Sequence, residues 1–243
     1  MMRRHLPAVL LLALAACSQA PAPAPAAPAS RSAATTSASA TPALSANLDR
    51  FALEIAAFDS ADQARPPAPG GIVFVGSSTI RLWTSLADDF AGLPVINRGF
   101  GGSTFPEALH YLQRTVVRYH PRTVVVYEGD NDLASGRTPQ QVAGDHGAFV
   151  RAVRDSLPSA RIVFLAIKPS PSRWKLESQR QEANRLVRAI VAADPNQTFV
   201  DVGTPMLDPS TGRPRPALYR ADSLHMTPAG YAIWRTTVAP VLK

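Results

Sequence analysis

An aspartate and a histidine stand three residues apart in the stretch DSLHMTPAGY, which covers residues 222–231 close to the end of the chain. A carboxylate such as Asp222 can hold an imidazole such as His225 in one tautomer, and the imidazole can then take a proton from a nucleophile. Thr227 and Pro228 suit the N-cap and the first position of a helix. We therefore expect His225 on a loop just ahead of a helix, although an isolated Asp-x-x-His is most often a solvated turn.

A candidate nucleophile occurs in GSST, residues 76–79, directly after an apolar run. A serine hydroxyl is a weak nucleophile at neutral pH and needs an adjacent base to take its proton. Taken alone, Ser77 and Ser78 are better explained as helix-capping residues. Among the five histidines of the chain, we assign the role of base to His225, because it alone combines an upstream acid with a position beyond the last predicted strand.

The elements expected to position these residues alternate along the chain. Short apolar runs predict buried strands at residues 71–76, 93–97, 122–129, 160–167 and 197–202. Apolar residues at helical spacing predict helices at residues 48–63, 79–90, 104–120, 138–157 and 176–194. This order predicts a parallel sheet with helices on both faces, in which ligands bind outside the carboxyl ends of the strands. We expect the stretches beyond those ends to converge: GSST, NRGFGGS, GDND and DSLH.

The four stretches, in this order, resemble the sequence blocks of the SGNH hydrolases, also called GDSL-type esterases and lipases. The resemblance covers nearly all of the predicted folded domain, and it implies a flavodoxin-like three-layer α/β/α sandwich with a five-stranded parallel sheet. It further implies that Ser78 is the nucleophile, His225 the base and Asp222 the residue that orients the base. Ser77 stands where the family has aspartate, and the register with Gly76 favours Ser78 as the attacking serine.

The resemblance also implies an oxyanion hole made by the backbone N–H groups of Ser78 and Gly102 and by the side-chain amide of Asn131. Donors of this kind stabilise the negative charge that develops on the carbonyl oxygen of an ester, and the loss of one costs about 10²- to 10³-fold in rate. Taken alone, GFGG fits a tight turn and Asn131 fits a turn residue that bonds its own backbone.

Other polar and aromatic residues near these blocks have structural explanations. We interpret Asn97 and Asp132 as residues that brace their loops, and Asp130 fits a solvated carboxylate. Two alternatives stay open for Arg173 and Trp174, which follow the fourth predicted strand. They either rim the pocket, where they could meet an anionic or flat apolar group, or belong to a proline-stiffened loop with Trp174 as a core anchor.

The first seventeen residues have a basic start, an apolar run and then the only cysteine of the chain, which is the pattern of an export signal. LAAC at residues 14–17 resembles the lipobox of bacterial lipoproteins. That resemblance implies lipidation at Cys17 and a membrane anchor in the cell envelope, facing the periplasm or the exterior, with Ser18 favouring the outer membrane. The alternative is an ordinary secretory signal that is cleaved near Ala16.

Composition sets the boundaries of the folded part and its partners. Residues 18–43 are mainly Ala, Pro, Ser and Thr, which predicts a flexible linker and leaves residues 44–243 as one domain. The formal net charge of +7 falls to +5 without Arg3 and Arg4, and the basic residues are scattered. We therefore expect no nucleic-acid partner.

A single cysteine excludes an internal disulfide and a thiolate metal site, and the dispersed histidines offer no metal-ligand spacing. GFGG fails as a dinucleotide-binding loop because Thr104 occupies the position of the third glycine. We expect a serine esterase that cleaves short acyl or acetyl groups from a small or polymer-borne ester and needs no cofactor or metal. Two alternatives stay open: an acyltransferase on the same fold, and a non-catalytic lipoprotein that binds an envelope polymer.

Overall fold

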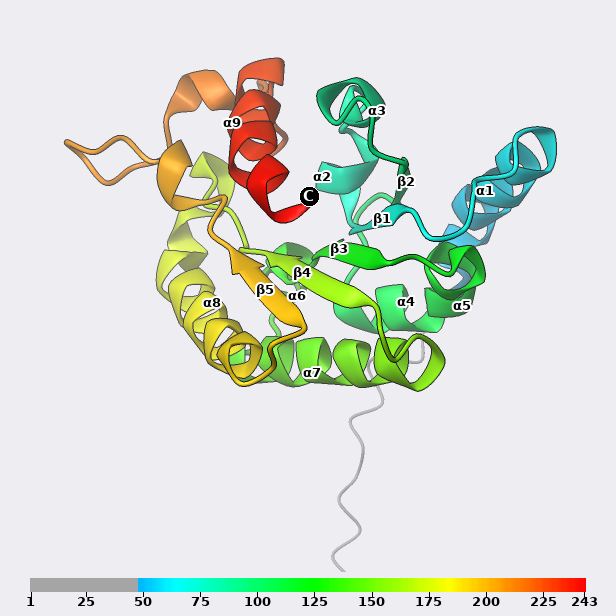
Figure 1. The fold of residues 1–243 in the computed structure, drawn as a ribbon. Coiled ribbons are helices and arrows are strands. Elements are labelled where there is room, and N and C mark those ends of the chain that lie inside the picture. Colours follow the sequence, from blue (N-terminus) through cyan, green and yellow to red (C-terminus); the bar gives the residue numbers. More distant parts are fainter. Residues whose placement is uncertain (1–47) are drawn as a thin grey trace, which may run out of the picture. The chain divides into compact units, whose positions relative to one another are not determined.

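A five-stranded parallel sheet forms the centre of the computed structural model, which describes residues 48–243 (Figure 1). Its strands are β1 (Ile72–Gly76), β2 (Val95–Gly99), β3 (Thr123–Tyr127), β4 (Arg161–Leu165) and β5 (Gln197–Val200). They lie in the order β2-β1-β3-β4-β5, and every neighbouring pair is parallel. The predicted signal peptide (1–17), with its lipidation site Cys17, and the predicted linker (18–43) lie outside the described residues.

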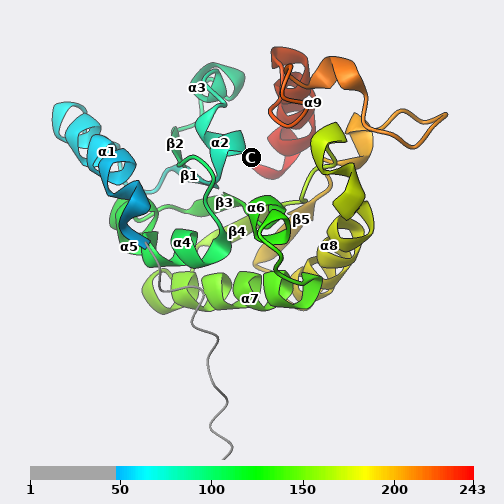
Figure 2. The same cartoon turned by 180° about the vertical axis from the view of Figure 1, so that it is seen from behind.

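Helices cover both faces of the sheet, so the three-layer α/β/α fold is confirmed (Figures 1 and 2). One face carries α4 (Phe105–His110), α7 (Pro139–Ser156) and α8 (Glu177–Ala192). The other carries α2 (Ser78–Arg81), α3 (Leu86–Asp89) and α9 (Pro228–Val238). Side chains of β1 alternate between the two apolar cores, with Val73 in one and Phe74 in the other. A strand buried on both faces needs an apolar residue at each position, which explains the apolar run.

The remaining helices are α1 (Ala52–Ala64), α5 (Leu112–Thr115) and α6 (Asp130–Ala134). Short 3₁₀ helices occur at Leu48–Phe51, Val117–Tyr119, Pro171–Leu176, Thr204–Met206, Pro216–Leu218 and Ala239–Val241. None of the helices between residues 48 and 243 is long and apolar enough to cross a membrane.

The continuous helix predicted at residues 79–90 is wrong, because the segment forms two short helices, α2 and α3. The side-chain amide of Asn97 donates hydrogen bonds to the carbonyls of Ile80 at 2.7 Å and Trp83 at 3.4 Å. Asn97, a residue of β2, therefore binds these two carbonyls at the place where α2 ends and a turn begins. Asn97 also accepts a hydrogen bond from the Gly99 backbone N–H at 2.9 Å, so its predicted bracing role is confirmed.

Strand ends differ by one or two residues from the sequence prediction, and one further predicted helix is divided. The segment 104–120 is divided into α4, α5 and a final 3₁₀ turn, which ends at His120 in a left-handed conformation with φ 45°. Strand β2 starts two residues later than predicted, because a turn in which the Leu93 N–H bonds the Phe90 carbonyl precedes it. Apolar runs predict that a strand exists, whereas turn hydrogen bonds decide where it starts.

Candidate active site

Ser78 is the first residue of α2, immediately beyond the carboxyl end of β1. Ser77 occupies the N-cap position, but its side chain makes no capping hydrogen bond and is almost fully buried. Its backbone N–H instead donates to the Tyr127 carbonyl at the end of β3. The helix-capping explanation of this serine pair is therefore wrong, and the turn presents Ser78 at the edge of the sheet where ligands bind.

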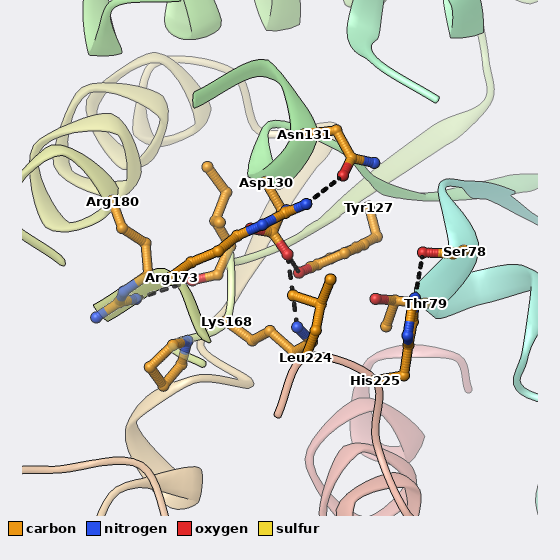
Figure 3. A network of polar contacts seen from close by, with 12 residues as sticks. Ser78, Thr79, Tyr127, Asp130, Asn131, Lys168, Arg173, Arg180, Leu224 and His225 are labelled. Atoms are coloured by element: carbon orange, nitrogen blue, oxygen red, sulfur yellow. Dashed lines mark hydrogen bonds and ion pairs between the residues drawn. The ribbon is translucent and has the colours of Figure 1, made fainter. Parts of the chain in front are cut away.

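Ser78, His225 and Asp222 form one line of hydrogen bonds. His225 Nε2 lies 3.0 Å from Ser78 Oγ, and His225 Nδ1 lies 2.7 Å from Asp222 Oδ2. Figure 3 shows His225 and Ser78 facing one another from two different segments of the chain. The order of groups is nucleophile, base and orienting acid, as in serine triads. The structure therefore brings together the three residues that the sequence predicted as catalytic.

The acid is held in place by the loop to which it belongs. Asp222 Oδ1 accepts hydrogen bonds from the backbone N–H groups of Leu224 and His225, both at 2.9 Å. The hydrogen bond from the His225 ring and these two backbone donors hold the pKa of Asp222 well below its usual range. Asp222 is therefore ionised at neutral pH, which suits a group that stabilises a charged imidazole.

The histidine loop is fixed at both of its ends. The Arg220 N–H donates to the His225 carbonyl at 2.8 Å, and the Arg220 guanidinium donates to the Met226 carbonyl at 3.0 Å. Thr227 takes the N-cap position of α9 as predicted, yet its hydroxyl donates to the Ala217 carbonyl and caps nothing. His225 therefore lies on a loop just ahead of a helix, as expected from Pro228.

The predicted oxyanion donors lie at the same end of the sheet. Within residues 48–243, neither the Ser78 nor the Gly102 backbone N–H has a hydrogen-bond acceptor. Gly102 has a φ of 80°, a conformation that favours glycine, and the space where a Cβ would lie is open. Asn131, in α6, donates from its amide nitrogen to the Ser103 carbonyl at 2.9 Å. That bond joins the Asn131 side chain to the glycine loop.

The glycine loop has a support that the sequence did not predict. The Arg50 guanidinium donates to the Gly102 carbonyl at 3.0 Å and also pairs with Glu107. Glu54, in α1, accepts a hydrogen bond from the Gly101 backbone N–H at 3.0 Å. Residues of the 3₁₀ helix Leu48–Phe51 and of α1 thus brace the glycine loop. The sequence pattern of this segment predicted a helix with an apolar face but none of these contacts.

Two carboxyl groups next to the glycine loop, those of Asp132 and Glu128, are fully buried. Asp132 accepts hydrogen bonds from the backbone N–H groups of Phe105 and Gly129, so its predicted bracing role is confirmed. Burial raises the pKa of Asp132 to about 7. Glu128 accepts a hydrogen bond from the Ser103 hydroxyl at 2.5 Å, and burial raises its pKa well above the usual range. Nothing in the sequence pattern singled out Glu128.

The interpretation of Asp130 as a solvated carboxylate is wrong. Its side chain is buried and contacts two cations, Lys168 Nζ at 3.5 Å and Arg173 Nη1 at 2.7 Å. Burial alone would raise the pKa of Asp130, but the charges of Lys168 and Arg173 outweigh it and the pKa lies below the usual value. Trp174 is half-buried under the Arg213 guanidinium, so it is not the core anchor that one alternative expected.

No group of three or more His, Cys, Asp or Glu side chains in the part of the chain that the structure describes is arranged to hold a metal ion. The reactive groups observed at this edge of the sheet are a serine, an imidazole, an ionised carboxylate and amide donors. Such a set can attack a carbonyl carbon, move a proton and stabilise an oxyanion.

The chain is similar to known proteins over a region that includes Ser78, Asp222 and His225. The profile of the GDSL-like Lipase/Acylhydrolase family matches residues 72–233. Platelet-activating factor acetylhydrolase IB subunit alpha1 of Pongo abelii is 31% identical over 169 residues, which are 66% of this chain and 70% of that protein. A solved GDSL-like lipase from Bacteroides thetaiotaomicron has a TM-score of 0.64 at 22% identity, covering 81% of this chain and 97% of that one.

A second solved structure agrees in fold. A catalytic mutant of an acetylxylan esterase from Geobacillus stearothermophilus has a TM-score of 0.58 at 15% identity, over 72% of this chain and 95% of that chain. At these identities the two structures show a shared arrangement of sheet and helices.

Proposed function

The chain belongs to the GDSL-like lipase/acylhydrolase family and is an ester hydrolase, and from this premise we propose that it works through an acyl-enzyme at Ser78. The observation that carries the proposal is the line of hydrogen bonds from Asp222 through His225 to Ser78. The distance is 2.7 Å from Asp222 Oδ2 to His225 Nδ1 and 3.0 Å from His225 Nε2 to Ser78 Oγ. A serine placed in hydrogen-bond reach of an oriented imidazole is the arrangement that activates a hydroxyl for attack.

In the first half of the proposed reaction, His225 Nε2 takes the Ser78 proton while Oγ bonds to the ester carbonyl carbon. The carbonyl oxygen becomes an oxyanion, and the N–H groups of Ser78 and Gly102 and the Asn131 amide stabilise it. As the oxyanion collapses, the bond to the alcohol oxygen breaks and His225 returns the proton to that oxygen. A water deprotonated by His225 then attacks the carbonyl carbon of the acyl-enzyme, the bond to Ser78 Oγ breaks, and His225 returns the proton to Oγ as the acid is released.

The proposal is tested by hydrolysis of p-nitrophenyl acetate by the full chain and three variants. We expect Ser78→Ala and His225→Ala each to remove nearly all activity, and Ser77→Ala, the matched control next to the nucleophile, to retain it. Full activity in Ser78→Ala would reject the assignment.

We further propose that the acyl group is acetyl or another short chain. Support comes from the names of two similar proteins, a platelet-activating factor acetylhydrolase and an acetylxylan esterase. A series of p-nitrophenyl esters from acetate to palmitate measures the preference directly, and we expect kcat/KM to fall as the chain lengthens. A maximum at palmitate would contradict the proposal. Product analysis with added alcohols separates hydrolysis from acyl transfer.

The location of the enzyme is a separate proposal that depends on residues 1–17. We propose that Cys17 carries a lipid and anchors the enzyme in the bacterial cell envelope, facing the periplasm or the exterior. The support is the lipobox-like LAAC sequence ahead of a linker-like composition. Labelling with tritiated palmitate should mark the full chain and not Cys17→Ala, and labelling that survives the substitution would reject the anchor.

A further inference from the structure

Arg173 joins two consecutive residues of α6 that differ in chemistry. It belongs to the 3₁₀ helix Pro171–Leu176, ahead of α8, and it reaches α6 with both ends of its guanidinium. Nη1 forms an ion pair with Asp130 Oδ1 at 2.7 Å, and Nη2 donates a hydrogen bond to Asn131 Oδ1 at 2.9 Å. One planar group thus contacts a carboxylate and the amide of the predicted oxyanion donor (Figure 3).

These contacts determine which way the Asn131 amide faces. An amide has an acceptor oxygen on one side and a donor nitrogen on the other. Arg173 has only donors, so it holds Oδ1, while the Ser103 carbonyl accepts from Nδ2 at 2.9 Å. Figure 3 shows the amide nitrogen turned away from Arg173. A 180° flip would set Nδ2 against a cation and Oδ1 against a carbonyl oxygen, and it would aim an acceptor where the oxyanion needs a donor.

Asp130 is in turn held from behind by buried groups. Its Oδ2 accepts hydrogen bonds from the Tyr127 hydroxyl at 3.4 Å and from Lys168 Nζ at 3.5 Å. Tyr127 and the Lys168 side chain are buried. The carboxylate therefore has little freedom to move, and the guanidinium that pairs with it is fixed as well.

We propose that Arg173 is a positioning residue, which keeps Asn131 in the orientation that donates to the oxyanion, with Asp130 as its support. This inference rests on the proposed serine-esterase function. The role of Arg173 is exerted through the Asn131 amide and not through contact with the substrate. Because the amide is needed most when charge develops on the carbonyl oxygen, loss of Arg173 lowers kcat and leaves KM almost unchanged.

The test is a double-mutant cycle on the full chain, with p-nitrophenyl acetate as substrate. We expect Asn131→Ala to lower kcat by about 10²- to 10³-fold and Arg173→Ala by about 10- to 10²-fold. If Arg173 acts through Asn131, the double variant resembles Asn131→Ala alone. Losses that multiply in the double variant, or a rise in KM at constant kcat, would overturn the proposal.

Chemical rescue separates positioning from a general loss of structure. Guanidinium chloride at a non-denaturing concentration should restore part of the kcat of Arg173→Ala and none of that of the double variant. Arg173→Lys, which keeps a positive charge and only donors at the end of the side chain, serves where the alanine variant does not fold. Arg185→Ala, which breaks an exposed ion pair with Glu182 on α8, is the matched control and should leave kcat unchanged.

Together with Ser78→Ala, the cycle separates a failure of the proposed esterase function from a failure of the positioning role. If Ser78→Ala keeps full activity, the proposed function fails and Arg173 has no reaction to assist. If Ser78→Ala and Asn131→Ala are both impaired while Arg173→Ala multiplies with Asn131→Ala, the esterase assignment stands and the positioning role is wrong.

Discussion

The two sides of the candidate site differ in how deeply their side chains are buried. On one side, Asp222 and His225 belong to a single loop, and their side chains are 47% and 24% exposed. On the other side, the charged residues that support Asn131 lie inside the protein: the side chain of Asp130 is 11% exposed and that of Lys168 is 0% exposed. The first side can therefore be altered at little cost to the fold, whereas a change on the second side leaves a buried charge without its partner.

The largest expected effect lies on the exposed side. His225→Ala removes the base, and kcat/KM for p-nitrophenyl acetate should fall by about 10⁵- to 10⁶-fold. The midpoint of thermal unfolding should stay close to that of the parent chain, because the loop keeps its backbone hydrogen bonds. A large drop in both activity and stability would show that the exposed side is part of the folding core, and the contrast between the sides would fail.

Asp222→Asn is a smaller change on the same, exposed side of the site. The amide oxygen of asparagine can still accept from the Leu224 and His225 N–H groups, so the loop is preserved. Its NH₂ group, however, faces His225 Nδ1 and favours the wrong tautomer, which costs about 10⁴-fold in kcat. Steady-state kinetics at neutral pH measure this loss. A loss below about tenfold would mean that Asp222 only forms a turn.

On the buried side, Asp130→Ala leaves Lys168 and Arg173 without their anion. Removing one partner of a buried ion pair costs about 3–5 kcal/mol of unfolding free energy. Urea denaturation should therefore show a clearly lower midpoint, together with a lower kcat. Glu182→Ala, which removes the anion of an exposed pair, is the control and should change the midpoint little. Equal effects of the two substitutions would remove the distinction between buried and exposed charges.

The smallest effect concerns pH and a buried histidine far from the loop. Burial lowers the pKa of His146, in α7, from 6.5 to about 4. The unfolded chain takes up a proton at this residue before the folded chain does, so its contribution to stability is present above pH 6.5 and is lost as the pH falls toward about 4. The loss amounts to about 3 kcal/mol.

His146→Phe tests this assignment, since the ring lies among the aromatic side chains of Phe105 and Phe164. The difference in unfolding free energy between the variant and the parent chain should shift in favour of the variant between pH 7 and about pH 4.5. Asp132, whose pKa is raised to about 7, titrates in both proteins and cancels in the comparison. A difference that is independent of pH would contradict the buried neutral imidazole.

The contrast also explains what the sequence could predict. Asp222 and His225 are three residues apart and follow the last strand, so local spacing and the order of apolar runs were sufficient to pair them. Ser78 was identified through the resemblance to the family's first sequence block and the register with Gly76, and its position after a buried strand agrees with the edge of the sheet where ligands bind. The three-layer fold followed from the alternation of apolar runs and helical patterns.

The buried side could not be found in this way. Arg173 lies 42 residues from Asn131 in sequence, and Lys168 lies 38 residues from Asp130, so these groups meet only in the folded chain. A charged residue in a loop is usually solvated, and that expectation failed for Asp130 because the loops after β3 and β4 enclose it. Likewise, the break between α2 and α3 depends on Asn97, a residue of a different strand.

The most direct test of the central claim is the site at which a fluorophosphonate reacts, determined by peptide mass spectrometry on the full chain. An activated serine nucleophile is phosphonylated on its hydroxyl, with loss of fluoride. We predict an adduct on Ser78 in the parent chain and in Ser77→Ala, no adduct in Ser78→Ala, and very slow labelling of His225→Ala. An adduct on Ser77, or labelling that persists in Ser78→Ala, would contradict the account.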